Sequence, residues 1–259
     1  MLLLVPAILL AVLGALVGAR ASRKALRIAG LVAIFMAVPW LLITAYYTHL
    51  FDVPAYFQWR SAPSTDWLAT GVGFATGLLV GVRARATRST GAHIAAVPIL
   101  ACIAVAVAFA KPWLQPQVSE LNDAWDQGVC IQTSVSSCGA CATATLLSHF
   151  DIAATEAGVA GVADTRLGGT PNWRLARVLR DEGLEATFRT PDGLEDISPP
   201  ALVGVRLGSP QGAAHFIVLL DRVGDEWIVG EPLEGRLALT TQQFQARYHF
   251  DHFALEVSR

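Results

Sequence analysis

Residues 132–147 read QTSVSSCGACATATLL, and expectations for the C-terminal half of the chain start from this run. The small residues that follow Cys138 predict a helix that begins at the cysteine and continues to His149. The first turn of a helix presents unpartnered backbone N–H groups and the positive end of the helix dipole, and both favour a thiolate. Cys138 is therefore predicted to be a nucleophile, with a buried structural thiol as the alternative.

Two later segments supply the partners that a cysteine nucleophile needs. His215 opens the apolar run HFIVLLDR, and Glu231 ends the strand-like run EWIVGE. An imidazole can take the thiol proton and return it to a leaving group, provided that an acceptor fixes its orientation. Gln132, together with the N–H of Cys138, can donate hydrogen bonds to an oxyanion. The alternative interpretations are that His215 is a core histidine, that Glu231 is a turn acid before Pro232, and that Gln132 is a surface glutamine.

The order and spacing of these motifs resemble the C39 peptidases, a papain-like family known for removing double-glycine leaders from bacteriocin precursors. The matching features are Gln132, the CGAC run, the histidine before a strand, the acidic-Pro pair and the polar-aromatic segment TTQQFQARY, and they cover about residues 124–259. The resemblance implies a cysteine peptidase with Cys138, His215, Glu231 and Gln132 as its catalytic residues. It also implies narrow subsites that accept Gly-Gly or other small residues before the scissile bond.

Three features depart from the family pattern. Glu231 precedes Pro232 where the family usually has Asp-Pro, and Ser137 stands where an acidic residue usually precedes the nucleophile. Well-known members are fused to an ABC transporter, and nothing in this chain resembles an ATP-binding cassette. A glutamate differs from an aspartate by one methylene group, so Glu231 is still expected to orient His215.

The N-terminal region, residues 1–111, has the composition of a membrane protein. The whole chain is 53% hydrophobic and 15% charged, with a mean hydropathy of +0.47. Such a composition is too apolar for a purely soluble protein. Four nearly uncharged segments approach the length that a membrane-spanning helix needs. They cover residues 2–19, 28–47, 67–82 and 94–110.

Basic residues predict how these spans are oriented. They follow the first and third segments at Arg20, Arg23, Lys24, Arg27, Arg83, Arg85 and Arg88. The loop Thr48–Asp66 has only Arg60. The positive-inside rule then places both termini outside the cytoplasm, so the protein is expected to be a multi-pass cell-membrane protein whose peptidase domain is extracytoplasmic. A cleaved signal peptide over residues 1–21 is the alternative, although this segment lacks a basic start.

The region after the spans is expected to form one α+β domain. A tether at residues 112–123 leads into the domain at 124–259, which is long enough for one core. Helices are predicted at 138–149 and 171–182. Strands are predicted within 184–190, 201–207, 215–222, 226–232, 235–240 and 252–257. They favour an antiparallel sheet, with the site where the helix of Cys138 packs against the strand of His215.

The other cysteines raise a competing chemistry. Cys138 and Cys141 form a C-x-x-C pair, as in thiol-disulfide oxidoreductases. That fold places the pair after a strand in a βαβ unit, whereas residues 123–137 look polar and loop-like. Cys130 and Cys141 are either joined by a disulfide or unpaired, and Cys102 is an apolar residue of the fourth span.

The remaining motifs indicate no cofactor and no metal. His249 and His252 lie three residues apart at a predicted helix-to-strand transition with no third ligand, so they are interpreted as surface or core histidines. The net charge of −2 gives no sign of nucleic-acid binding. Expected partners are a peptide or protein substrate such as a leader-bearing precursor, the lipid bilayer, and a membrane partner or transporter. A non-hydrolytic module that binds peptides in the same groove is a further alternative.

Overall fold

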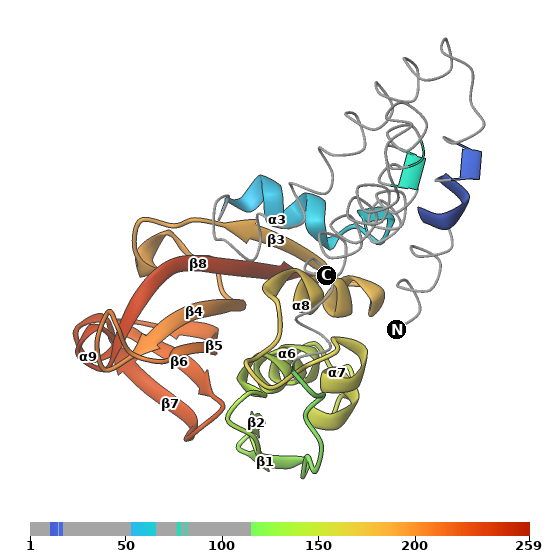
Figure 1. The fold of residues 1–259 in the computed structure, drawn as a ribbon. Coiled ribbons are helices and arrows are strands. Elements are labelled where there is room, and N and C mark those ends of the chain that lie inside the picture. The colour runs from blue at the N-terminus through green and yellow to red at the C-terminus, as the bar shows by residue number, and fades with distance from the viewer. Residues whose placement is uncertain (1–10, 15, 18–52, 66–76, 79–80, 82–114) are drawn as a thin grey trace. The chain divides into compact units, whose positions relative to one another are not determined.

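The computed structural model describes residues 11–14, 16–17, 53–65, 77–78, 81 and 115–259 (Figure 1). Almost all of the four predicted spans lies outside these residues. Within the described part of the chain, no helix combines the length and the apolar character needed to cross a bilayer. The chain divides into two compact units, and the one that contains the predicted catalytic residues comprises Val53–Ser61 and Gln115–Arg259.

This unit is a mixed helix and sheet domain, as predicted. Its helices are α3 (Pro54–Ser61), α6 (Cys138–His149), α7 (Glu156–Val162), α8 (Asn172–Asp181) and α9 (Thr241–Arg247), with a short 3₁₀ turn η2 (Leu194–Asp196). Its strands are β1 (Ala124–Asp126), β2 (Val129–Ile131), β3 (Glu185–Arg189), β4 (Ala201–Leu207), β5 (Ala214–Val223), β6 (Glu226–Glu231), β7 (Gly235–Thr240) and β8 (Tyr248–Ser258).

Six strands form an antiparallel sheet in the order β3-β8-β4-β5-β6-β7. The long strand β8 lies between β3 and β4 and carries the end of the chain back through the sheet (Figure 1). Helix α6 packs against β4, β5 and β6, which confirms the predicted contact between the helix of Cys138 and the strand of His215. Ile217 lies in the core cluster with Phe244 of α9, whereas its neighbour Phe216 faces α6.

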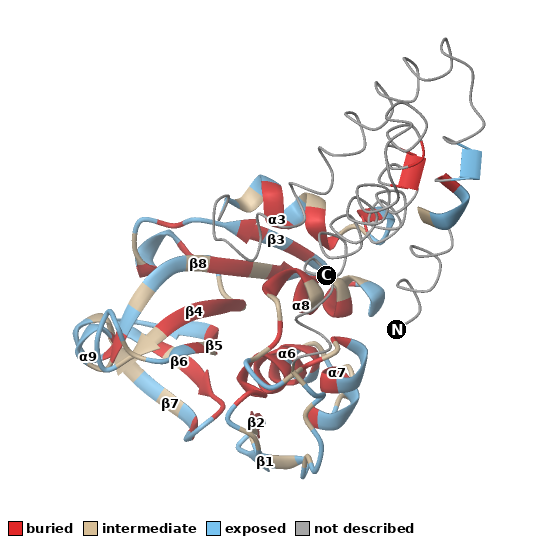
Figure 2. Ribbon diagram, viewed as in Figure 1, coloured by how far each residue is buried: buried red, intermediate tan, exposed pale blue. Residues whose placement is uncertain are grey.

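Helix α6 is buried along almost its whole length (Figure 2). Its residues from Cys138 to Leu147 are all buried, and most of them are small. A helix with no polar face belongs inside the domain rather than on its surface. The fit is close at Gly139, where an added Cβ would lie 3.0 Å from Leu175 of α8 and 3.2 Å from Phe216 of β5.

A β-hairpin precedes α6, where the sequence suggested only a loop. Strands β1 and β2 pair so that Asp126 lies opposite Val129, which leaves Gln127 and Gly128 as a two-residue turn. Both turn residues have positive φ, 45° and 80°, as a type I′ hairpin requires. The hairpin is separate from the six-stranded sheet, so β2 and α6 form no βαβ unit.

Helix α3 was not predicted as part of this domain, yet it packs against α8 and β3. The ring of Phe57 lies 5.6 Å from that of Phe188 on β3 and 6.0 Å from that of Phe253 on β8. Arg180 of α8 donates to Gln58 Oε1 at 2.8 Å, and Arg177 donates to the carbonyl of Ser61 at 3.1 Å. Arg180 also donates to Ser61 Oγ. An apolar contact and arginine hydrogen bonds from α8 therefore hold α3 against the domain.

Candidate active site

Cys138 is the first residue of α6, in the position that the sequence predicted. Its side chain is buried, as are those of His215 and Glu231. The first N–H groups of α6 have no partner within the helix, and together with the helix dipole they favour negative charge at the sulfur and at an adjacent oxyanion. The local structure of Cys138 therefore suits a thiolate nucleophile.

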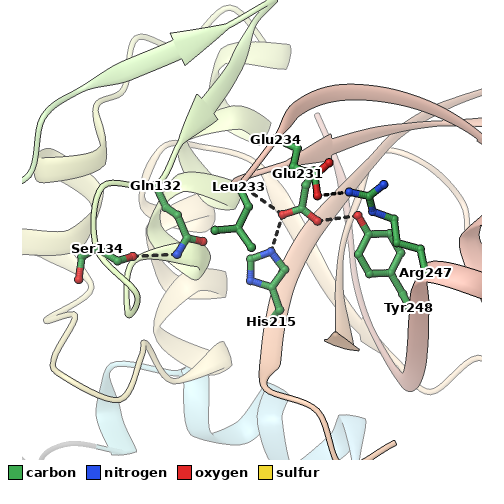
Figure 3. Close-up of polar contacts among 8 residues, drawn as sticks. All are labelled: Gln132, Ser134, His215, Glu231, Leu233, Glu234, Arg247 and Tyr248. Carbon is green, nitrogen blue, oxygen red and sulfur yellow. Dashed lines mark hydrogen bonds and ion pairs between the residues drawn. The ribbon is translucent and has the colours of Figure 1, made fainter. Parts of the chain in front are cut away.

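His215 and Glu231 form the closest polar contact of the site. His215 near the start of β5 and Glu231 at the end of β6 lie with Nε2 and Oε1 2.5 Å apart (Figure 3). Strands β5 and β6 are hydrogen-bonded neighbours, and this pairing brings the two residues together across 16 positions of sequence. With Nε2 committed to Glu231, Nδ1 is the ring nitrogen that remains for a proton exchange with Cys138.

The sulfur and the carboxylate together favour the protonated imidazole. Burial opposes a charge on the ring, but contacts with Cys138 and Glu231 outweigh it and raise the pKa of His215 to about 9. An imidazolium next to Cys138 is the partner that stabilises a thiolate. The structure thus brings together the thiol, the imidazole and the acid that the sequence singled out.

Tyr248 is a site residue that the sequence did not reveal. Its hydroxyl donates to Glu231 Oε2 at 2.7 Å, and the backbone N–H of Leu233 donates to Oε1 at 3.0 Å (Figure 3). Burial raises the pKa of Glu231, but the bonds from His215, Tyr248 and Leu233 lower it below the ordinary value overall. Glu231 is therefore a charged, fixed acceptor for His215, and the tyrosine is visible only once β8 is placed beside β4.

Gln132 lies just after β2, and its backbone ties it to the loop that follows Glu231. Its N–H donates to the carbonyl of Pro232 at 2.8 Å, and its side-chain Nε2 donates to the carbonyl of Ser134 at 2.8 Å (Figure 3). An amide nitrogen carries two hydrogens, so the bond to Ser134 orients the group and leaves one donor for a ligand. The buried Oε1 has no hydrogen-bond partner among the described residues.

Glu156 is a second residue that the sequence analysis missed. It begins α7, is fully buried, and accepts from Thr133 twice, from the backbone N–H at 2.9 Å and from Oγ1 at 2.6 Å. Thr133 directly follows Gln132, so this carboxylate fixes the backbone that presents the glutamine. A buried acid is a signal that only the structure supplies, because Thr155-Glu156 reads in sequence as an ordinary helix start.

The two remaining cysteines of the domain face each other. Cys130 Sγ donates a hydrogen bond to Cys141 Sγ at 2.9 Å, and both residues are fully buried free thiols in this structure. The C-x-x-C alternative would need Cys141 to serve Cys138 as resolving thiol. Instead, Cys130 and burial raise the pKa of Cys141 far above the ordinary value, which suppresses its thiolate.

Helix α9 ends at Arg247 and β8 begins at Tyr248, so His249 and His252 directly follow the predicted helix-to-strand transition and lie within β8. His252 Nδ1 lies 3.1 Å from the carbonyl of Pro191. Among the residues that the structure describes, no group of three His, Cys, Asp or Glu side chains is placed to hold a metal ion.

A thiol at a helix start, a buried imidazole and an orienting carboxylate are the parts of a cysteine hydrolase site. The sequence profile of the peptidase C39 family matches residues 126–259, and the chain belongs to this family of cysteine peptidases. No curated protein matches the chain.

Solved structures of peptidase domains are similar to the chain at low identity. A double-glycine motif protease from an AMS/PCAT transporter, solved with a leader peptide, is 19% identical with a TM-score of 0.44, covering 55% of this chain and 96% of that one. The peptidase domain of Streptococcus ComA is 18% identical with a TM-score of 0.43, covering 49% and 95%. The C39-like domain of a toxin secretion ATP-binding protein from Vibrio parahaemolyticus is 17% identical with a TM-score of 0.37, covering 49% and 99%.

Proposed function

We propose that this protein is a membrane-anchored cysteine peptidase that cleaves exported or membrane-associated peptides after small residues such as Gly-Gly. The observation that carries the proposal is the contact between His215 and Glu231 beside Cys138 at the start of α6. Neither a structural thiol nor a core histidine needs a charged acceptor held by Tyr248 and a backbone N–H.

In the acylation step, the thiolate of Cys138 attacks the carbonyl carbon of the scissile peptide bond. The oxyanion that forms accepts from the N–H of Cys138 and from the free N–H of the Gln132 amide. His215 then gives its proton to the leaving amine as the C–N bond breaks, and a thioester remains on Cys138. Glu231 holds the ring in place throughout this step.

In the deacylation step, a water molecule attacks the thioester, and His215 takes a proton from that water. The C–S bond breaks, the peptide leaves as a carboxylic acid, and the ion pair of Cys138 and His215 is restored. Loss of one oxyanion donor typically lowers kcat by about 10² to 10³. Gln132→Ala is accordingly expected to slow the reaction without abolishing it.

The substrate class comes from the C39 resemblance, in which double-glycine leaders occupy narrow subsites. The apolar segments at 2–19, 28–47, 67–82 and 94–110 supply the anchoring part of the proposal. Such an enzyme would meet its substrate during or after export, and a separate transporter is the partner that this arrangement suggests.

The position of α3 supports an extracytoplasmic domain. This helix comes from the loop between the second and third apolar segments, and it belongs to the same compact unit as the catalytic residues. That loop and the domain must therefore lie on the same side of the membrane. The sparse positive charge of Thr48–Asp66 predicts that this side is outside.

Covalent labelling tests the proposal directly. The purified full-length protein is treated with a chloromethyl ketone of a peptide that ends in Gly-Gly, and the modified residue is mapped by mass spectrometry. Labelling is expected only at Cys138, and it should disappear in Cys138→Ala and fall strongly in His215→Ala. Cys141→Ala is the matched control and should be labelled normally, whereas equal labelling of Cys138 with and without His215 would contradict the proposal.

A further inference from the structure

Cys130 and Cys141 form a thiol pair that the proposed peptidase mechanism does not use. Their sulfurs are 2.9 Å apart, and both side chains have no exposed surface. A covalent S–S bond is about 2.05 Å long, so less than an ångström separates this contact from a disulfide. The pair lies between strand β2 of the hairpin and helix α6, which pack against each other.

The backbone on both sides of the pair is already held in place. The N–H of Cys130 donates to Thr145 Oγ1 of α6 at 2.9 Å, in a buried bond. Cys130 also lies opposite Trp125 in the hairpin, and Cys141 donates its N–H to Ser137 within the first turn of α6. The two sulfurs therefore meet because two ordered elements meet, and a disulfide needs them to approach by less than an ångström.

We propose that Cys130 and Cys141 are joined by a disulfide in the extracytoplasmic enzyme, and that this bond keeps Cys138 free. The inference rests on the location proposed above, because disulfides persist outside the cytoplasm. The two thiols lose two protons and two electrons as the S–S bond forms. A protein disulfide of a thiol-disulfide oxidase accepts both electrons and becomes a dithiol. Since the thiols are buried in the folded domain, the exchange takes place while the domain folds.

The proposed bond would prevent Cys141 from forming a disulfide with the nucleophile Cys138. Cys138-Gly-Ala-Cys141 at a helix start is the arrangement that forms a disulfide readily under oxidising conditions. In an oxidising compartment that bond would inactivate the nucleophile. A Cys130 to Cys141 bond removes Cys141 from this competition, and it closes a loop that contains both Gln132 and Cys138.

Mapping of the disulfide in the full-length protein tests the first part of the inference. Exported protein is quenched in acid, alkylated in denaturant without reductant, and digested with pepsin, because no Lys or Arg lies between Lys111 and Arg166. We expect a peptide mass lower by two hydrogen atoms, with fragments that link Cys130 to Cys141, and an alkylated Cys138. Alkylation of both Cys130 and Cys141, or a bond from Cys141 to Cys138, would overturn it.

Three variants test whether the bond protects the nucleophile. Cys130→Ala should release Cys141 to pair with Cys138, so labelling of Cys138 should be lost and then return with reductant. The double variant Cys130→Ala/Cys141→Ala should be labelled without reductant, as should Cys141→Ala alone. Loss of labelling in Cys130→Ala that neither reductant nor the second substitution restores would contradict the protective role.

The two proposals fail in different ways. Disulfide mapping needs no peptidase activity, and it can be repeated in Cys138→Ala. A Cys130 to Cys141 bond together with an unreactive Cys138 would overturn the proposed peptidase and leave the disulfide standing. A reactive Cys138 with Cys130 and Cys141 both reduced would do the reverse.

Discussion

Glu231 is a buried carboxylate, and its negative charge helps to raise the pKa of His215. The pKa of His215 is about 6.5 in the unfolded chain and is raised to about 9 in the folded protein. Folding therefore favours the protonated imidazolium. Its contribution to stability is therefore complete below about pH 6.5 and is lost as the pH rises through about 9. The proton for the leaving amine is lost over the same range, so the rate of cleavage should fall above about pH 9.

The substitution Glu231→Gln should shift the alkaline limb of the pH–rate profile, the fall in cleavage rate at high pH, to lower pH. Glu231→Gln keeps an oxygen near Nε2 but removes the negative charge that raises the pKa of His215, so cleavage should decline at lower pH than in the parent protein. The measurement is kcat/KM for an internally quenched Gly-Gly peptide across the pH range. Glu226→Gln, an exposed site on the same strand, is the control and should leave the limb in place. An identical limb in Glu231→Gln would contradict the assignment.

Glu156 makes a different residue-scale prediction, because it acts through Thr133 and Gln132 rather than on the substrate. Glu156→Gln keeps the size of the side chain but replaces charge-assisted bonds to Thr133 with weaker ones. Hydrogen bonds to charged groups contribute about 1.5 to 3 kcal/mol each, so the unfolding free energy should fall by about 2 kcal/mol. Unfolding of the purified protein in denaturant measures this loss.

A positioning role for Glu156 also predicts a kinetic signature. If the Gln132 backbone becomes mobile, kcat should fall more than KM rises, because the oxyanion contact is made mainly in the transition state. Glu195→Gln provides the matched control, since Glu195 is an exposed acid whose partners Arg222 and Thr241 lie at the surface. Equal stability and kinetics in the two variants would show that Glu156 does not hold the glutamine.

At the scale of elements, the sequence predicted the parts with a strong pattern. Helix α6 begins at Cys138 and ends at His149 as expected, and each of the six predicted strands is present in the sheet. Small residues in an unbroken run and alternating apolar residues are local signals. The contact between α6 and β5 also followed, because Cys138 and His215 had to meet in any cysteine hydrolase.

The elements that the sequence did not predict have weak local signals. Strands β1 and β2 are three residues each, too short to display an alternation, although Gly128 between them is a turn signal in retrospect. Helix α7 contains Gly158 and Gly161, which disfavour a helix, and it depends on the Thr155 cap and the buried Glu156. Tyr248 reaches Glu231 only through long-range strand pairing.

The docking of α3 makes a prediction at the same scale. Phe57 is nearly buried between Phe188 and Phe253, so Phe57→Ala should lower the local stability of α3 and β3 by about 3 kcal/mol. Hydrogen exchange of the full-length protein in detergent should show faster exchange in these two elements. Val53→Ala, at a side chain that is half exposed, should change little. Unchanged protection in Phe57→Ala would mean that α3 is not held by this contact.

At the scale of the whole molecule, the proposed topology links the membrane segments to the site. If α3 and the catalytic domain form one unit, the chain must leave the membrane on the same side after the second and the fourth apolar segments. This condition is met when the chain between α3 and the catalytic domain crosses the membrane an even number of times. The segments at 67–82 and 94–110 provide two crossings, so the number of proposed spans agrees with the docking of α3.

Single introduced cysteines in intact cells can test this topology, in a background that lacks Cys102, Cys130, Cys138 and Cys141. We expect a membrane-impermeant maleimide to label Val53→Cys beside α3 and Asp151→Cys on the catalytic domain, because both side chains are well exposed. Lys24→Cys in the basic first loop should react only after the cells are opened. Labelling of Lys24→Cys alone in intact cells would invert the orientation and remove the basis for a disulfide. Labelling at position 151 but not at 53 would instead contradict the docking of α3, because one compact unit cannot lie on both sides of the membrane.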